Sequence, residues 1–331
     1  MPWSVDALEG LQSGGAVSDA ASWLRACAET DAGETVVLRQ GRVLLPLHWR
    51  RRHGLVVVEA LGQEHRSVAG PLGVGEEGMP ALRPEDLPHK ADLADFRRFP
   101  AAYADSLFPS CASRLARVDI ERFKRTLAAD EEAFLATLSK GARKDLHYAM
   151  RRVERVFGKD AARHEAVILQ AANWEATWEK AAGLARRSWQ GRAGVSVFTS
   201  GKRERFLEKL MQNGMMVKMH FYRCGDVLTA VAITMETNCE ILIYAHEYHC
   251  AYAKYRPGHI LNFHVIAEAL SQGIPILDFG VGATRHKYEW QCVPQTLWRV
   301  LVPLNWKGRL ALAYQRARWA CGGLRDRAAK T

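Results

Sequence analysis

The sequence predicts an α+β protein built on a mixed sheet. Its second half is patterned, in order, as a strand, two helices, three strands joined by short turns, a helix and a further strand. No Gly-x-Gly-x-x-Gly motif follows the first of these strands, which argues against a doubly wound, dinucleotide-binding sheet. A chain of 331 residues with 48% hydrophobic residues is long enough for two domains, each with its own core.

The N-terminal portion is predicted to be a helix followed by strands. Residues 17–29 have helical character, and Ser18 suits the position that caps such a helix. The expected strands are residues 35–39, 43–47 and 54–61. Gln40 and Gly41 form the turn of a hairpin between the first two strands. The glycines of residues 70–75 are interpreted as a loop.

Residues 76–118 have the least regular pattern in the chain. They contain five prolines: Pro80, Pro84, Pro88, Pro100 and Pro109. Long ordered loops in compact proteins are often functional, so this segment is a candidate wall of a substrate groove. The alternative interpretation is a set of short connecting helices at residues 92–98 and 101–107.

A basic amphipathic helix is predicted between the two halves of the chain. Residues 119–157 have a helical pattern, and in residues 138–156 the apolar side chains share one face opposite the basic ones. Gly158 is suited to end this helix. We therefore place a domain boundary near residue 158.

The second half of the chain has the clearest patterns of secondary structure. The expected helices are residues 174–187 and 202–212. The expected strands are residues 165–169, 216–222, 227–235, 240–245, 274–280 and 298–303. Hairpin turns at residues 223–226 and 236–238 separate the three central strands.

Within this half, residues 252–261 have the pattern of an anion-binding helix start. They lie between an apolar strand at residues 239–245 and an amphipathic segment at residues 259–272. Pro257 fits the first turn of a helix, where its missing N–H is no loss. Gly258 has no Cβ that would block the approach of a ligand.

Two features would favour a phosphate at this helix start. A helix N-terminus carries roughly half a positive charge, and Lys254 and Arg256 add whole charges beside it. The N–H groups expected to point at the ligand are those of Gly258, His259 and Ile260. The plainer alternative is that the Pro-Gly pair only begins a helix.

The order of short motifs around this stretch resembles a known family. The chain has Ser188-Trp189-Gln190-Gly191, then Tyr255-Arg256-Pro257-Gly258, then a helix, and then Asp278-Phe279-x-x-Gly282-x-x-x-x-Lys287-x-x-Trp290. This order is similar to that of the acyltransferase family named for cellulose biosynthesis, the CelD-like group of the GNAT superfamily. The Fem-type peptidyltransferases are relatives of that group.

Three positions depart from the family pattern. Arg256 stands where the family usually has Ser, Ala283 where it has an acidic residue, and His286 where it has Tyr. The first change favours anion binding. The other two leave the acceptor and the acid-base residue open.

The resemblance implies two GNAT-like halves in tandem, the first of them degenerate, joined by the basic helix. The expected domains are residues 1–137 for the degenerate half, 138–158 for the linking helix, 159–305 for the acyltransferase domain and 306–331 for a basic amphipathic tail. The resemblance also implies an acyl-CoA donor, acetyl-CoA or longer, and no metal. The residues expected to bind this donor are Tyr244, Tyr255, Arg256, Pro257, Gly258, His259 and Ile260.

Acyl transfer needs a route for the acceptor's proton and donors for the developing oxyanion. His246 and Glu247 follow directly on a predicted strand, and a histidine titrates near the pH at which a base is most useful. The expected catalytic residues are His246, Glu247, Asp278, His286 and Lys287. A salt bridge between Lys287 and Asp278 is an equally good alternative for that pair, and packing is the alternative for His246.

Three aromatic residues, Trp189, Tyr252 and Trp290, are candidates for an acceptor-binding wall. Aromatic residues at such spacings also occur in cores, and that alternative stays open.

The cysteines and the first residues of the chain indicate the cellular compartment. The seven cysteines are scattered and include no Cys-x-x-Cys pair, which argues against a disulfide framework or a zinc knuckle. The first residues lack the features of a signal peptide, and no apolar run reaches the about 20 residues that span a bilayer. We expect a cytoplasmic protein, with the inner membrane surface as a further candidate location.

The net charge of +10 is concentrated in two segments. Residues 306–331 contain seven Lys or Arg against one Asp, and residues 140–155 contain six against two acidic residues. Such clusters suit a polyanion or an anionic membrane surface, and a solvated helix face is the alternative.

The leading hypothesis is an acyl-CoA-dependent N- or O-acyltransferase. The resemblance implies a saccharide, an amino sugar or a small metabolite of envelope or secondary biosynthesis as the acceptor. One alternative is a Fem-like aminoacyl-tRNA-dependent peptidyltransferase, supported by the two basic clusters. The other is a catalytically silent binding or assembly partner.

Overall fold

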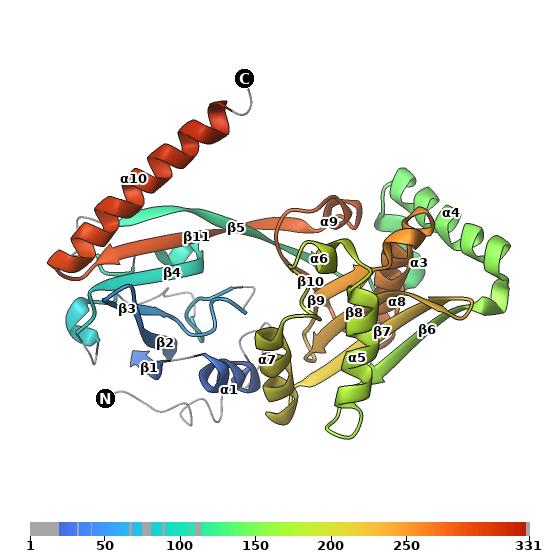
Figure 1. The fold of residues 1–331 in the computed structure, drawn as a ribbon, viewed down its shortest axis with the longest axis horizontal. Helices are drawn as coiled ribbons and strands as arrows, with labels where there is room; N and C mark the ends of the chain where they lie inside the picture. The colour runs from blue at the N-terminus through green and yellow to red at the C-terminus, as the bar shows by residue number, and fades with distance from the viewer. Residues whose placement is uncertain are drawn as a thin grey trace. The chain divides into compact units, whose positions relative to one another are not determined.

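The computed structural model describes residues 20–328, except residues 32, 41, 66–67, 75–80, 88–89, 105 and 110–113. It divides into two compact units, whose elements are labelled in Figure 1. Unit 1 contains Asp31–Ile120 and Thr296–Thr331, and unit 2 contains Glu121–Gln295 together with helix α1 (Ala21–Thr30). Strands β5 (Leu115–Thr126) and β11 (Val293–Pro303) each have residues in both units. The four expected domains stay a prediction.

Unit 1 has a mixed sheet with the strand order β1-β2-β3-β4-β11. Neighbouring strands are antiparallel, except β3 and β4, which are parallel. The strands not yet given are β1 (Glu34–Gln40), β2 (Val43–Arg52), β3 (Leu55–Ala60) and β4 (Leu93–Pro100). The predicted β1–β2 hairpin is confirmed, although Gly41 of its turn lies outside the described residues.

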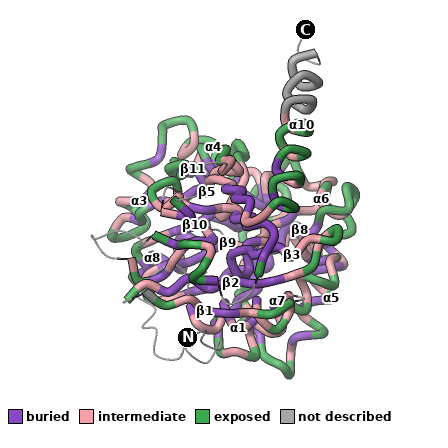
Figure 2. Tube along the Cα trace, turned by 90° about the vertical axis from the view of Figure 1, so that its left-hand side faces the viewer, coloured by how far each residue is buried: buried purple, intermediate pink, exposed green. Residues whose placement is uncertain are grey.

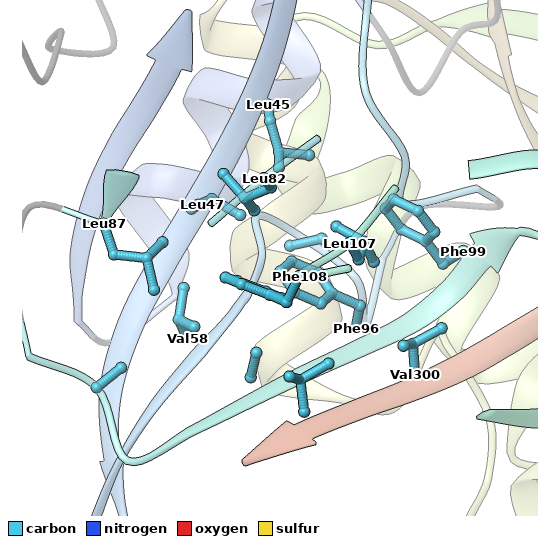
Figure 3. Close-up of a cluster of buried hydrophobic side chains, with 14 of the residues drawn as sticks. Leu45, Leu47, Val58, Leu82, Leu87, Phe96, Phe99, Leu107, Phe108 and Val300 are labelled. Atoms are coloured by element: carbon cyan, nitrogen blue, oxygen red, sulfur yellow. The ribbon is translucent and has the colours of Figure 1, made fainter. Parts of the chain in front are cut away.

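The core of unit 1 forms on one face of this sheet. Leu47, Val58, Phe96, Phe108 and Val300, from strands and a connecting segment, pack together there (Figure 3). Helix α10 (Trp306–Ala328) follows β11, and its Leu312 packs against Leu93 and Leu301. In Figure 2 the central strands are mostly buried, whereas residues 306–319, the described part of α10, are mostly exposed.

The expectation for residues 92–98 was wrong in both its forms, because this segment is neither a loop nor a helix. It lies in β4, which pairs with β3 on one side and β11 on the other. Arg98 has a left-handed backbone (φ 53°), and the register with β11 shifts between Trp298 and Val300. This irregularity interrupts the alternation by which a strand is recognised. The short helices here are a 3-10 turn (Pro84–Asp86) and α2 (Ala101–Ala104).

In unit 2 the strand order is β5-β10-β9-β8-β7-β6. Neighbouring strands are antiparallel, except β9 and β10, which are parallel. The remaining strands are β6 (Ala162–Ile168), β7 (Met216–Cys224), β8 (Val227–Glu236), β9 (Glu240–Tyr248) and β10 (Ile276–Val281). The predicted α+β class with a mixed sheet is therefore confirmed.

Helices cover both faces of this sheet. Phe221 of β7 lies under Lys180 of α5 (Trp174–Ala185), and the next residue, Tyr222, packs with Leu261 of α8 (Pro257–Ser271). Because successive side chains of a strand point to opposite faces, α5 and α8 lie on opposite sides of the sheet. The predicted helices at residues 174–187 and 202–212 correspond to α5 and α7 (Gly201–Gln212).

The helix predicted at residues 138–156 is confirmed as α4 (Lys140–Phe157), which Gly158 ends with a φ of 94°. Its role as a link between two domains stays a prediction, because α4 lies within unit 2. The buried residues of α4 are Leu146, Ala149 and Val153. Helical structure does not extend back to residue 119, since residues up to Thr126 belong to β5 and are followed by α3 (Glu131–Thr137). The predicted N-terminal helix is α1, whose Trp23 packs against Phe206 of α7; Ser18 lies outside the described residues.

Candidate active site

Strands β9 and β10 separate in the middle of the unit 2 sheet. Their parallel pairing runs from Glu240 to Leu242 of β9, after which β10 shifts its register and continues alongside β5. At the same point β9 has a bulge. Ile243 and Ala245 pair with consecutive residues of β8, so Tyr244 between them has no partner there. Bulges are common beside active sites, because they redirect a strand and end its pairing. The end of β9 therefore has an edge that β10 does not cover.

Helix α8 begins beside this edge. Pro257 occupies its first turn, as predicted, and the preceding Arg256 has a left-handed backbone (φ 53°, ψ 44°) that non-glycine residues rarely adopt. The N–H groups of His259 and Ile260 both donate to the Arg256 carbonyl, at 3.0 and 3.2 Å. The expectation of three free N–H groups was therefore wrong for these two. The Gly258 N–H alone of the three has no acceptor among the described residues.

Gly258 also permits a close approach between α8 and β9. A Cβ at this position would lie 3.3 Å from Cδ1 of Tyr248. A larger side chain would have to displace the tyrosine ring, so glycine keeps the helix start against the end of the strand.

A cavity of about 440 Å³ opens at this place, entirely within unit 2. Its lining residues are His246, Tyr248, Ala253, Arg256, Pro257, Gly258, His259, Asn262, Arg285, His286 and Glu289. Six of the predicted site residues are among them. The sequence reasoning missed the other five: Tyr248, Ala253, Asn262, Arg285 and Glu289. Asn262 and Glu289 each lie four residues after a lining residue, Gly258 or Arg285, on the same helical face.

Three buried polar atoms of these lining residues lack a hydrogen-bond partner among the described residues. They are Nδ1 of His259, Oδ1 of Asn262 and Nε2 of His286. Buried polar groups in native proteins are nearly always satisfied. Three such atoms around one cavity indicate a ligand or ordered water in it.

His246 and His286 meet in the cavity wall, with ring centroids 4.6 Å apart and ring planes at 81°. Burial and the charge of Lys287 lower the pKa of His246 to about 4. Burial, His246 and Lys287 lower the pKa of His286 to about 2. Both imidazoles are therefore neutral at pH 7, and each has a lone pair that can accept a hydrogen bond.

The positive charge of Arg256 is partly neutralised by two neighbouring carboxylates. Its guanidinium donates to Glu289 Oε2 at 2.6 Å and to Asp145 Oδ2 at 3.2 Å, while Arg285 donates to Glu289 Oε1 at 2.9 Å. A phosphate in the cavity would compete with Glu289 for Arg256.

Lys287 and Asp278 do not form the salt bridge considered for them. Lys287 Nζ donates to the carbonyls of Val281 and Gly280, at 2.9 and 3.3 Å, and burial lowers its pKa to about 8. The fully buried Asp278 accepts from Arg122 at 2.6 Å, and Arg122 also donates to Glu240 at 3.2 Å. These ion pairs lie between β5, β9 and β10.

Glu247 points away from the cavity lining. It accepts a hydrogen bond from Ser188 Oγ at 2.6 Å, and the same oxygen of Ser188 caps the short helix α6 (Trp189–Arg192). Burial raises the pKa of Glu247, against the lowering effect of the Ser188 hydrogen bond. Glu247 therefore fastens the segment around α6 to the end of β9.

The other predicted aromatic and apolar site residues lie outside the cavity lining. Tyr244 accepts a hydrogen bond from Arg203 at 2.7 Å and contacts Trp23, while Tyr252 and Tyr255 pack around Phe157. Trp290 is fully buried beneath His259, Ile260 is in the core, and Trp189 is exposed on α6. Their assigned roles in binding stay predictions.

Residues 140–288 match the family model of the acetyltransferase (GNAT) domain. The match covers less than half of the chain, so residues 140–288 are similar to a GNAT domain. The matched segment runs from α4 into α9 (Arg285–Glu289) and includes all of the cavity-lining residues except Glu289. A search of curated proteins found no match.

Solved structures with a similar fold cover both units. FemX has 8% identity and a TM-score of 0.58, with coverage of 91% of this chain and 96% of its own. The C-terminal domain of a putative lysylphosphatidylglycerol synthetase from Agrobacterium fabrum has 12% identity and a TM-score of 0.53, with coverage of 88% and 90%. A conserved protein of unknown function from Bacteroides thetaiotaomicron has 11% identity and a TM-score of 0.54, with coverage of 85% and 89%. At these low identities the similarity is evidence for the fold alone.

Proposed function

We propose that unit 2 transfers an acyl group from an acyl-CoA to an amine or hydroxyl acceptor in the cavity between β9, α8 and α9. The observation that carries this proposal is the set of unpartnered polar atoms of His259, Asn262 and His286 around the cavity. They lie in the segment that is similar to a GNAT domain, where β9 leaves β10 and α8 begins. The CelD-like resemblance adds a saccharide, an amino sugar or a small metabolite as the acceptor class.

The donor's phosphates fit the start of α8. The Gly258 N–H and the helix dipole favour an anion there, and Arg256 can turn from Glu289 to a phosphate oxygen. The uncovered edge of β9 offers backbone groups to the amides of a pantetheine arm. This combination would hold the thioester beside His246.

His246 and His286 suit the reacting end of the cavity. Both are neutral at pH 7, so either can accept the proton that an amine or hydroxyl loses as it attacks the thioester carbonyl. The acyl carbon then bonds to the acceptor, the carbon–sulfur bond breaks, and the thiolate leaves with CoA. The cationic Lys287 behind the two histidines favours the developing negative charge.

Calorimetric titration with acetyl-CoA, a long-chain acyl-CoA and free CoA tests the donor site. We expect binding to the wild-type chain and a loss of at least about tenfold in affinity for Gly258→Val, because its side chain meets Tyr248 and fills the place of the phosphate. Gly201→Val is the matched control, since a Cβ at Gly201 meets nothing within 4 Å. Absence of binding by the folded wild type, or equal binding by Gly258→Val, would overturn the proposal.

The second candidate is a Fem-like aminoacyl-tRNA-dependent peptidyltransferase. The exposed face of α4 carries Lys140, Lys144, Arg151 and Arg155, a basic surface suited to a nucleic-acid backbone. A peptidyltransferase of this kind should bind tRNA with an affinity that falls steeply as the salt concentration rises. Changing these four residues to Gln should weaken this binding. If neither acyl-CoA nor charged tRNA binds, the catalytically silent partner is favoured.

The anionic membrane surface stays a proposed partner of α10. Trp306, Leu310 and Tyr314 are each more than 60% exposed and recur every four residues on this helix. Across the described residues, no helix combines the length and apolar character needed to span a bilayer. We expect flotation with phosphatidylserine vesicles that Leu310→Glu weakens and that the equally exposed control Val195→Glu leaves unchanged.

A further inference from the structure

Three potential metal ligands come together on the α8 side of the unit 2 sheet, outside the acyl-transfer cavity. They are His164 of β6, His220 of β7 and Glu268 of α8, and their ligand atoms all lie within 4.8 Å of one another. His164 Nε2 is 3.2 Å from His220 Nδ1, and His220 Nδ1 is 3.8 Å from Glu268 Oε2. The proposed acyl transfer uses none of these residues.

The fold explains why they meet. In the antiparallel β6–β7 pair, His164 lies opposite Tyr222, and His220 lies opposite Ala166. His164 and His220 are therefore diagonal neighbours on the same face as Tyr222, the face that α8 covers. Glu268 is on the part of α8 that passes over these two strands.

The distance between the two imidazole nitrogens fits a shared tetrahedral ion. Two nitrogens bound to one tetrahedral zinc at about 2.0–2.1 Å stand about 3.3–3.4 Å apart. His164 Nε2 and His220 Nδ1 are 3.2 Å apart without any adjustment. Glu268 Oε2 is 3.8 Å from His220 Nδ1, so its half-buried side chain would have to move closer to complete the third position.

The surroundings of the three residues support ligation. His220 Nε2 is 2.9 Å from Thr234 Oγ1, a partner that directs the lone pair of Nδ1 toward His164 and Glu268. Lys218 Nζ donates to the other oxygen of Glu268 at 2.8 Å and leaves Oε2 facing His220. The ring of His264 stacks on that of His164, with centroids 5.0 Å apart and planes at 8°, and holds it in place.

We propose that unit 2 binds one divalent transition-metal ion, of the zinc class, through His164, His220 and Glu268, with a fourth position open to solvent. Two imidazoles and one carboxylate are a ligand set that zinc accepts. The ion would tie the edge strand β6 to β7 and α8, and so stabilise the sheet edge. The sequence did not predict this site, because its ligands are 56 and 48 residues apart and lack a short motif.

Zinc titration of the chelator-treated, full-length protein tests the proposal. We expect one zinc ion per chain in the wild type, and a loss of at least about tenfold in affinity for His164→Ala and for Glu268→Gln. His147→Ala is the matched control, because His147 is exposed on α4 and lies apart from the cluster. His164 is preferred to His220 for substitution, because His220 is fully buried and its loss could prevent folding.

A thermal melt with and without zinc gives a second readout. Zinc should raise the melting temperature of the wild type and of His147→Ala, because a ligand that binds only the folded state stabilises it. The same zinc concentration should leave the melting temperature of His164→Ala unchanged. Equal zinc affinity in the wild type and in folded His164→Ala, or no binding by the wild type, would overturn the proposal and leave a hydrogen-bonded histidine pair.

Discussion

The imidazole rings of His246, near the end of β9, and His286, on α9, meet edge to face with their centroids 4.6 Å apart. They come from segments 40 residues apart and share the wall of one cavity. Because both are largely withdrawn from water near Lys287, each resists protonation.

We predict that the free energy of unfolding falls as the pH is lowered from about 6.5 to 4, partly through this pair. The folded-state pKa of His246 is about 4, below the unfolded value of about 6.5, so the unfolded chain binds more protons in this window. The contribution is fully present above pH 6.5 and is lost as the pH falls. Urea denaturation of the wild type and of His246→Gln at several pH values measures it.

Between pH 7 and pH 4 the free energy of unfolding of the wild type should fall by about 3 kcal/mol relative to that of His246→Gln. His147→Gln is the control for the loss of an imidazole, because His147 is exposed on α4. Parallel pH profiles for the wild type and His246→Gln would contradict the lowered pKa.

Glu289 is predicted to restrain Arg256 in the absence of the donor. Its carboxylate accepts from Arg256 at 2.6 Å and adds a negative charge to the wall of the cavity. We expect Glu289→Gln to bind free CoA about two- to fivefold more tightly, since it releases Arg256 and removes repulsion of the phosphates. Glu132→Gln, an exposed change on α3, is the control. Weaker CoA binding by Glu289→Gln would show that Glu289 itself contacts the donor.

Glu247 is predicted to act in positioning, through Ser188. Removing the hydroxyl in Ser188→Ala takes a hydrogen bond from the buried carboxylate and a cap from α6. We expect a loss of about 1–3 kcal/mol in the free energy of unfolding for Ser188→Ala and for Glu247→Gln. Chemical denaturation measures this loss. If Glu247→Gln abolished acyl transfer without losing stability, Glu247 would be the base.

Arg122 is predicted to be essential to the folded state of unit 2. Its guanidinium lies between the buried carboxylates of Asp278 and Glu240. Arg122→Met should cost about 3–5 kcal/mol, because it leaves Asp278 buried without a counter-charge. The double variant Arg122→Met/Asp278→Leu should recover part of this loss in urea denaturation. A stable Arg122→Met protein would contradict this structural role of Asp278.

Local patterns predicted the elements that hold the candidate site. The run of three strands was visible from alternation and turn residues, and the start of α8 from Pro257 and Gly258. Five predicted cavity-lining residues lie at the ends of these elements, whereas His286 was placed by the resemblance to the family motif.

The missed features depend on contacts between distant segments. β4 was not recognised, because pairing with β3 and β11 on its two sides outweighs a weak local pattern. The partner of Asp278 was assigned to nearby Lys287, whereas the observed partner, Arg122, is 156 residues away in sequence. The left-handed backbone of Arg256, which directs its carbonyl at the N–H groups of His259 and Ile260, has no signal in a non-glycine residue.

The position of Arg122 on β5 limits how this protein can be shortened. A fragment cut to the family-matched residues 140–288 would contain Asp278 and Glu240 but lack the strand that brings their common cation. Without β5, strand β10 would become an unpaired edge strand, and exposed edge strands promote aggregation. A usable catalytic fragment must therefore begin before Glu121, and truncations designed from family boundaries alone should yield insoluble material.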